Sequence, residues 1–166
     1  MNLGESFVGV GVNAAHINTI VGERSGPAGA AWASALASPQ AGHVPFVAVL
    51  QPSLPVKPMT LFVTKSAPVS DAHGTLIWGP AQAGVAAGVA DALADGTLAV
   101  HTADDHVVIA AVWVDPKADD ADTVYRNNRE ATACALRNGM TGFPPIEAVL
   151  AARDHPVNPF YTAPEH

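Results

Sequence analysis

Apolar and polar residues follow a period of two in several short stretches of the chain, which predicts β-strands. Residues His16–Val21 are rich in β-branched side chains, a composition typical of strands. The period of two places His16 and Asn18 on one face of this strand and Ile17 on the other. A shorter extended segment precedes it, across a glycine-rich bend at Gly9–Asn13. Further strands are predicted at His43–Leu50, Met59–Lys65 and Val107–Val114.

Proline, glycine and acidic residues mark the ends of the predicted helices. Pro27 suits the first turn of a helix that ends near Ala37. A second helix opens at Gly79-Pro80 and runs to about Asp95, and its many Ala and Gly residues let another backbone approach closely. Apolar side chains recur every four residues along it and predict a buried stripe. This stripe comprises Val85, Val89 and Leu93, and further helices are predicted from the acidic Asp119–Asp122 stretch to Gly139 and after Pro144-Pro145.

The order of these elements predicts an α+β fold in which helices pack on a mostly antiparallel or mixed sheet. Residues 1–153 are expected to form a single domain, since no repeat and no linker interrupts them. Residues 154–166 contain three prolines and no periodicity, so they are expected to form an extended C-terminal tail.

Composition narrows the class of protein. The chain has 166 residues, of which 49% are hydrophobic and 14% charged, enough apolar material for a core. Its net charge of -7 and its scattered basic residues argue against binding to nucleic acid or to an anionic membrane. A single cysteine excludes an intramolecular disulfide framework. With no signal peptide at the start and no apolar run near the ~18 residues of a membrane helix, we expect a cytoplasmic protein.

Residues Gly9–Ala14 fit the pattern G-x-G-x-x-A, so a dinucleotide fingerprint has to be considered. That fingerprint needs a helix directly after the glycines, because the helix N-terminus holds the pyrophosphate. The residues that follow here favour a strand. A tight turn between two strands is therefore the better interpretation.

Three polar residues are candidates for a site, although each also has an ordinary structural explanation. His16 lies beside glycines on a predicted strand, and histidine changes charge near neutral pH. Lys65 ends an apolar strand, where a lysine commonly extends to water. Gln82, in the first turn of the long helix, could orient a ligand or cap its own helix.

Other reactive residue types give weaker signals. The cluster His101, Asp104, Asp105 and His106 is the one metal candidate, but its spacing matches no zinc motif and a polar turn before a strand explains it. Cys134 lies among small apolar residues and is expected to pack in the core. The sequence contains no G-x-S-x-G, P-loop or HExxH motif.

Several longer motifs occur together in one order. The first is G-E-x-x-V-G-x-G-x-N-x-A-H-I at Gly4–Ile17, and it resembles the N-terminal signature of the formaldehyde-activating enzymes. The resemblance extends from about residue 3 to residue 150 without large gaps. The later motifs are AGH at Ala41–His43, VAVLQPSLPVKPMTL at Val47–Leu61, GPAQAGVAAGVADAL at Gly79–Leu93, ADDHVVIAAV at Ala103–Val112 and EAT at Glu130–Thr132.

This resemblance implies a reaction and a fold. Enzymes of the family are hydro-lyases that condense formaldehyde with tetrahydromethanopterin, a co-substrate, to give methylenetetrahydromethanopterin and water without a metal. They form homopentamers of a two-layer α+β fold with helices on one face of the sheet. Their left-handed βαβ crossover is similar to that of ribosomal-protein domain-2-like folds. The family's proton-donating histidine falls on His16, and its pterin-contacting lysine and glutamine fall on Lys65 and Gln82.

Three further pterin-contacting positions of the family hold different residues here. The usual aspartate is Asn18, a leucine is Val47 and a threonine is Ala67. An asparagine keeps the shape of aspartate but loses its charge and replaces one acceptor oxygen by a donor amide. Two alternatives therefore stay open: a non-catalytic module that binds a pterin or an aldehyde adduct, and an enzyme that uses another cyclic-amine or folate-like acceptor.

Overall fold

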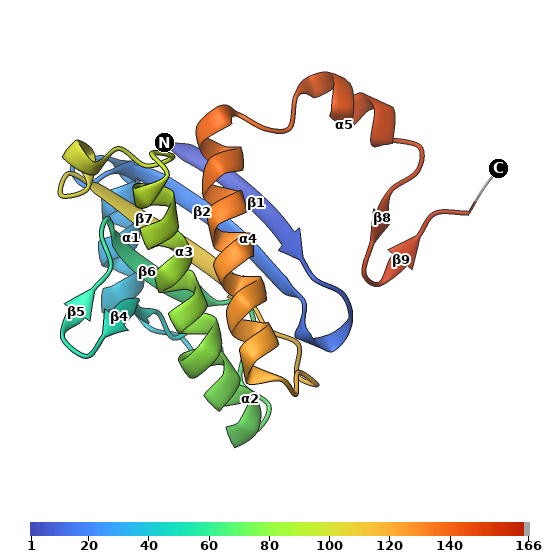
Figure 1. The fold of residues 1–166 in the computed structure, drawn as a ribbon, viewed down its shortest axis with the longest axis horizontal. Coiled ribbons are helices and arrows are strands. Elements are labelled where there is room, and N and C mark those ends of the chain that lie inside the picture. The colour runs from blue at the N-terminus through green and yellow to red at the C-terminus, as the bar shows by residue number, and fades with distance from the viewer. Residues whose placement is uncertain (165–166) are drawn as a thin grey trace.

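A computed structural model describes residues 1–164 of the protein. Its centre is a five-stranded sheet with the order β1-β2-β7-β6-β3 (Figure 1). The β6–β7 pair is parallel and the other three pairs are antiparallel. The predicted α+β class with a mixed sheet is thus confirmed. The strands are β1 (Asn2–Val8), β2 (Ala15–Glu23), β3 (Phe46–Val47), β6 (Met59–Thr64) and β7 (His106–Trp113).

Alternation along β2 separates the two faces of the sheet, as predicted. Ile17 and Thr19 are buried, whereas His16 and Asn18 point to the other face and are half-buried. Helices α3 (Gln82–Ala94) and α4 (Ala121–Thr141) cover the buried face. The short 3₁₀ turn η1 (Gly11–Asn13) leads directly into β2, so no helix follows the G-x-G-x-x-A pattern.

Helix α1 (Pro27–Ala37) has the predicted bounds but lies on the opposite face from α3 and α4. A Cβ built on Gly22 would come within 2.8 Å of Ala28 Cβ, and Gly22 shares its side of β2 with His16. The small side chains of these two residues allow α1 to pack there. The helices therefore do not all lie on one face of the sheet, unlike the expectation from the resemblance.

The connection between the parallel strands β6 and β7 is helical over a longer stretch than predicted. It begins at α2 (Asp71–Leu76), where the Ser70 side chain accepts a hydrogen bond from His73 N. A π-helical turn, η2 (Ile77–Ala81), then joins α2 to α3 and contains Pro80. The prediction that Gly79-Pro80 starts the helix is wrong, because the wider turn accommodates a residue that has no N–H to donate.

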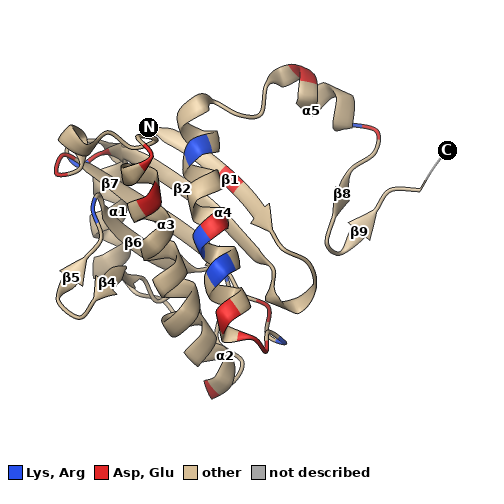
Figure 2. Ribbon diagram, viewed as in Figure 1, with Lys and Arg blue, Asp and Glu red and all other residues tan. Residues whose placement is uncertain are grey.

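Helices α3 and α4 pack closely at glycines of α3. A Cβ on Gly88 would lie 2.5 Å from Arg129 O, so only glycine fits between the two backbones. Ion pairs join the outer surfaces of the same helices, from Arg129 to Asp91 and from Arg137 to Asp95, in the part of α4 where Figure 2 shows charged residues. Val85 and Val89 of the predicted stripe are fully buried and Leu93 is half-buried.

The predicted strand at His43–Leu50 is interrupted. Residues of β3 pair with β6, but β4 (Val49–Gln51) turns away to pair with β5 (Leu54–Pro55). Ala48, at the break, is buried and hydrogen-bonds through its N to Thr60 O and through its O to Val56 N. The apolar run therefore contributes one strand to the five-stranded sheet and one to a separate two-stranded sheet.

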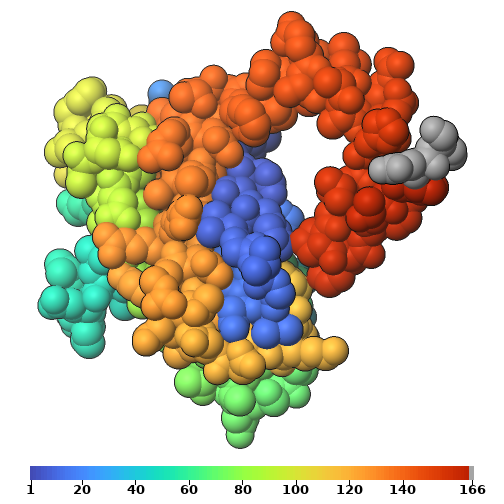
Figure 3. All heavy atoms as spheres, turned by 45° about the vertical axis from the view of Figure 1, so that its right-hand side comes forward, coloured from blue at the N-terminus to red at the C-terminus, as the bar shows by residue number. Residues whose placement is uncertain are grey.

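Residues 143–164 form what we call the C-terminal arm. It contains α5 (Ile146–Ala152) and a hairpin of β8 (Val157–Asn158) and β9 (Tyr161–Thr162), so the tail predicted to be extended includes paired strands. Every residue from 141 to 162 is exposed. The arm leaves an opening between itself and the body before the hairpin returns to the sheet (Figure 3). In residues 1–164 no helix combines the length and apolarity needed to cross a membrane.

Candidate active site

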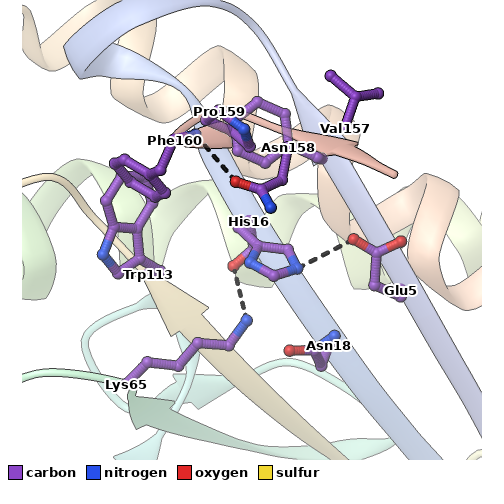
Figure 4. A pocket seen from close by; sticks show the side chains of 10 residues that line it. Glu5, His16, Asn18, Lys65, Trp113, Val157, Asn158, Pro159 and Phe160 are labelled. Carbon is purple, nitrogen blue, oxygen red and sulfur yellow. Dashed lines mark hydrogen bonds and ion pairs between the residues drawn. The ribbon is translucent and has the colours of Figure 1, made fainter. Parts of the chain in front are cut away.

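His16 and Glu5 lie on neighbouring strands and face the same side of the sheet. In the β1–β2 register Phe7 is opposite His16 and Glu5 is opposite Asn18. A period of two puts Glu5 and Phe7 on one side of β1, so both side chains reach His16. Glu5 Oε1 is 2.9 Å from His16 Nε2, and the rings of Phe7 and His16 have centroids 5.9 Å apart (Figure 4).

Lys65 reaches the same place from the other side of β7. It follows the last residue of β6, and its N–H donates to Val112 O at 2.9 Å, which fixes the start of the side chain. Its ammonium Nζ donates to His16 O at 3.3 Å. Among the ion pairs between residues 1 and 164, none involves Lys65.

These side chains line a cavity of about 730 Å³. The sheet forms one wall and the hairpin of the C-terminal arm forms the other, where Phe160 meets Trp113 edge-on with centroids 5.9 Å apart (Figure 4). Largely apolar walls with a few convergent polar groups are typical of a small-molecule site. The lining residues are Glu5, Phe7, His16, Asn18, Lys65, Trp113, Val157, Asn158, Pro159 and Phe160.

The cavity changes the acidity of both basic groups. Partial burial, and after it the charge of Lys65, lower the pKa of His16 from 6.5, while the Glu5 carboxylate opposes both effects. Burial lowers the pKa of Lys65 from 10.5 to about 8, again against the charge of Glu5. At neutral pH a fraction of the Lys65 side chains is therefore the free amine, and Glu5 stabilises the protonated form of His16.

A model of the family described as "Formaldehyde-activating enzyme (Fae)" matches residues 3–161. The chain belongs to the formaldehyde-activating enzyme family. The match extends through most of the C-terminal arm, which makes the arm part of the family's sequence pattern.

The chain is similar to one relative of about its own length and to bifunctional enzymes that are much longer. The chain is 42% identical over 158 residues to the 5,6,7,8-tetrahydromethanopterin hydro-lyase of Methanosarcina barkeri, covering 95% of this chain and 89% of that protein. It is 42% identical over 159 residues to the Bifunctional enzyme Fae/Hps of Archaeoglobus fulgidus, covering 95% of this chain. It is also 40% identical over 152 residues, 92% of this chain, to the enzyme of that name from Methanosphaerula palustris. This chain spans 40% and 39% of those two bifunctional enzymes.

The six site positions suggested by the family fall into two groups in the structure. His16, Asn18 and Lys65 meet in the cavity. Gln82 lies elsewhere, with its buried side-chain amide hydrogen-bonded to Val49 N at 3.2 Å and to Val49 O at 2.9 Å. Val47 is half-buried in β3, and Ala67 is exposed near Gly42. These last three residues do not line the cavity within this chain.

The six site positions suggested by the family do not include Glu5, Phe7, Trp113 and the arm residues that also line the cavity. Glu5 and Phe7 could have been found from the alternation of G-E-S-F-V, which puts both on the face of the neighbouring strand. Trp113 sits opposite His16 in the β2–β7 register, a pairing that only the sheet order reveals. The local sequence does not place the arm residues at the cavity, because a long connection brings them back to it.

Two of the other residues with possible chemistry have structural partners. Asp104 pairs with Lys57, and His106 Nδ1 lies 3.2 Å from Thr102 O. No group of three or more potential metal ligands occurs within residues 1–164. His73, which the sequence did not single out, is buried and contacts Val69 N and Val114 O through its two ring nitrogens.

Proposed function

We propose that this chain condenses formaldehyde with tetrahydromethanopterin to give 5,10-methylenetetrahydromethanopterin and water. Membership of the family and the name of the Methanosarcina barkeri relative support the reaction. The observation that carries it is the meeting of His16 and Lys65 in one aromatic-walled cavity. A planar heterocycle such as a pterin suits walls made of Phe7, Trp113 and Phe160.

His16 is proposed as the general acid. The N5 amine of the pterin adds to formaldehyde to give a carbinolamine, whose hydroxyl must leave as water. A proton from His16 assists that departure, and N10 then captures the resulting iminium and closes the ring. Glu5 is proposed to position the imidazole and to stabilise its charged form, since its carboxylate lies 2.9 Å from Nε2.

Asn18 and Lys65 are proposed to contact the pterin inside the cavity. Val47, Ala67 and Gln82 are proposed to contact it from a neighbouring copy of the chain, because they do not line the cavity of their own chain. This arrangement requires a homo-oligomer with the site at a subunit boundary, and we propose the pentamer that the family resemblance implies. The same resemblance implies a left-handed crossover between β6 and β7.

The proposed function is tested by the condensation assay with authentic tetrahydromethanopterin. Formation of the methylene product should exceed the spontaneous rate in proportion to the concentration of protein. Light scattering on the same sample should give a mass several times that of the 17.0 kDa chain. A rate equal to the background contradicts the enzymatic function, and a stable monomer contradicts the shared site.

Asn18 gives a specific reason to keep a second candidate, a non-catalytic module that binds a pterin. Its neutral amide stands in the cavity where the family usually has a carboxylate, and a charge-assisted hydrogen bond is roughly twice as strong as a neutral one. Titration by pterin fluorescence separates the two candidates, because a module binds without accelerating the reaction. If the substitution limits activity, Asn18→Asp should raise the condensation rate. Turnover only with a different cyclic amine would identify another acceptor.

A further inference from the structure

Lys65 differs in its surroundings from the other two lysines of the chain. Lys57 is exposed and pairs with Asp104, and Lys117 is exposed as well. Lys65 is half-buried in the cavity, and its recorded hydrogen-bond partner within residues 1–164 is a neutral carbonyl, His16 O. A carbonyl stabilises an ammonium group less than a carboxylate does, so this amine is the one best placed to lose its proton.

We propose that Lys65 captures formaldehyde covalently and passes the one-carbon unit to the pterin amine. This inference rests on the proposed function for the identity of the two substrates. Formaldehyde is too small to offer much binding surface, so a reversible bond to a fixed amine holds it where noncovalent contacts cannot. The backbone hydrogen bond to Val112 and the Nζ contact to His16 O place that amine beside the imidazole.

Capture proceeds in two steps. The Lys65 nitrogen donates its lone pair to the formaldehyde carbon, the π electrons of the C=O bond move to oxygen, and one N–H proton moves to that oxygen. The product is a carbinolamine. His16 then donates a proton to the hydroxyl, the C–O bond breaks, water leaves, and the nitrogen lone pair forms the C=N bond of a cationic iminium.

Transfer reverses the bond to lysine. The pterin N5 amine adds to the iminium carbon and returns its proton to His16. His16 passes this proton to the Lys65 nitrogen, the C–N bond to lysine breaks, and the neutral amine leaves an iminium on N5. N10 adds to that iminium and gives its proton to His16, which restores the acid. The oxidation level of the carbon does not change in any step, so no oxidant or reductant is needed.

The other cavity residues suit a cationic intermediate. The faces of Trp113 and Phe160 attract cations, and their apolar bulk limits the water that would hydrolyse an iminium. The Glu5 carboxylate faces the same space and supplies the opposite charge. His16 and Glu5 are the titratable groups that line the cavity with Lys65 within residues 1–164.

The expected selectivity follows from the amount of free amine. With a pKa of about 8 rather than 10.5, Lys65 has about 300 times more free amine at pH 7 than an ordinary lysine. A less basic amine is also a weaker nucleophile. With a Brønsted slope of about 0.4–0.5, as for thiols, this weakening reduces the rate advantage roughly tenfold. Lys65 should therefore react about 20 times faster than Lys57 or Lys117.

Reductive trapping on the full chain tests the capture step without the pterin. The protein is treated with formaldehyde and cyanoborohydride at pH 7, which converts each iminium into an N-methyl amine. Peptide mass spectrometry then measures methylation at each lysine. The α-amino group of the chain has an ordinary pKa of about 8 as well, so its methylation shows how fast an amine of that basicity reacts outside the cavity. Lys57→Arg is the control substitution and should leave methylation of Lys65 unchanged.

We expect early methylation at Lys65 to exceed that at Lys57, Lys117 and the α-amino group, and His16→Ala to reduce it several-fold. Equal methylation of Lys65 and the α-amino group overturns the proposal. So does wild-type condensation activity in Lys65→Arg, which retains a charge but has no lysine amine. Condensation without selective trapping leaves the proposed function standing and removes the capture step. Selective trapping without condensation supports the capture step and contradicts the proposed function.

Discussion

At the scale of single residues, burial and two neighbours of opposite charge set the pKa of His16. Glu5 favours its protonated form, while burial and Lys65 disfavour it. The imidazolium is therefore a minority species at neutral pH, available when a leaving hydroxyl needs a proton. The proposed capture step also needs Lys65 in its neutral form, so the productive combination should exist only over a limited range of pH.

Removal of the imidazole should abolish most catalysis. We expect His16→Ala to lower the condensation rate above background by about 10²–10⁴-fold, the usual contribution of a positioned acid or base. The assay is the formation of the methylene product, with light scattering and circular dichroism as controls for folding and assembly. A folded variant with wild-type activity would show that another group supplies the proton.

Glu5→Gln should move the pH profile of kcat/KM towards lower pH. The carboxylate raises the pKa of both His16 and Lys65, so its loss lowers both values. The limb that requires protonated His16 and the limb that requires neutral Lys65 then shift in the same direction. Because Glu5 is exposed, solvent screening keeps this shift small. A lower rate with an unchanged profile would mean that Glu5 acts only through packing.

At the scale of elements, the sequence predicted those parts of the fold that local pattern determines. Strand β2, with His16 and Asn18 on one face, follows from alternation, and α1 follows from Pro27 and a run of good helix formers. The break at Ala48 did not follow, because it depends on hydrogen bonds to Thr60 and Val56 across other strands. The π-helical turn around Pro80 likewise depends on the packing of the helices that it joins.

The candidate site, like the fold, could be predicted from the sequence only in part. Family positions identified three of the polar residues that line the cavity, His16, Asn18 and Lys65. Glu5 required the strand register, and the arm residues required the tertiary fold. For Gln82 the local sequence left open a ligand contact or a helix cap, and within the chain its amide bonds to the backbone of Val49.

The contact between α3 and α4 gives a prediction on stability. Gly88→Ala places a methyl group 2.5 Å from Arg129 O and 2.8 Å from Thr132 Cβ, in a layer where neither neighbour can move freely. Overpacking costs about 1–3 kcal/mol, and the better helix propensity of alanine returns about 1 kcal/mol. We expect Gly88→Ala to lower the free energy of unfolding, measured with denaturant, by up to about 2 kcal/mol.

Gly79→Ala is the matched control for that substitution. No atom lies within 4 Å of a Cβ built on Gly79, so its free energy of unfolding should stay within about 0.5 kcal/mol of the wild-type value. Equal stability of the two variants would mean that the helices separate to accept the methyl group.

At the scale of the whole molecule, the arm contributes to the cavity but little to the core. Every residue from 141 to 162 is exposed, yet Val157–Phe160 supply four of the ten residues that line the cavity. The boundary at residue 153 remains a prediction. A chain that ends at Arg153 tests it, because the rest of the protein should fold without the hairpin.

We expect that shortened chain to keep its thermal midpoint to within a few degrees, since only exposed contacts are lost. The KM for the pterin should rise by about 2- to 12-fold, which corresponds to the roughly 0.5–1.5 kcal/mol of one aromatic pair. Phe160→Ala in the full chain should reproduce most of this increase. Failure of the shortened chain to fold would make the arm part of the domain.

Because the sheet carries His16 and the arm carries Phe160, the proposed proton donor and one aromatic wall of the cavity are encoded in separate stretches of sequence. Mutations at 157–160 can reshape the entrance for a bulkier or smaller amine while the proton-transfer groups stay in register. Related proteins could diverge in their choice of acceptor through this one hairpin and retain the same reaction.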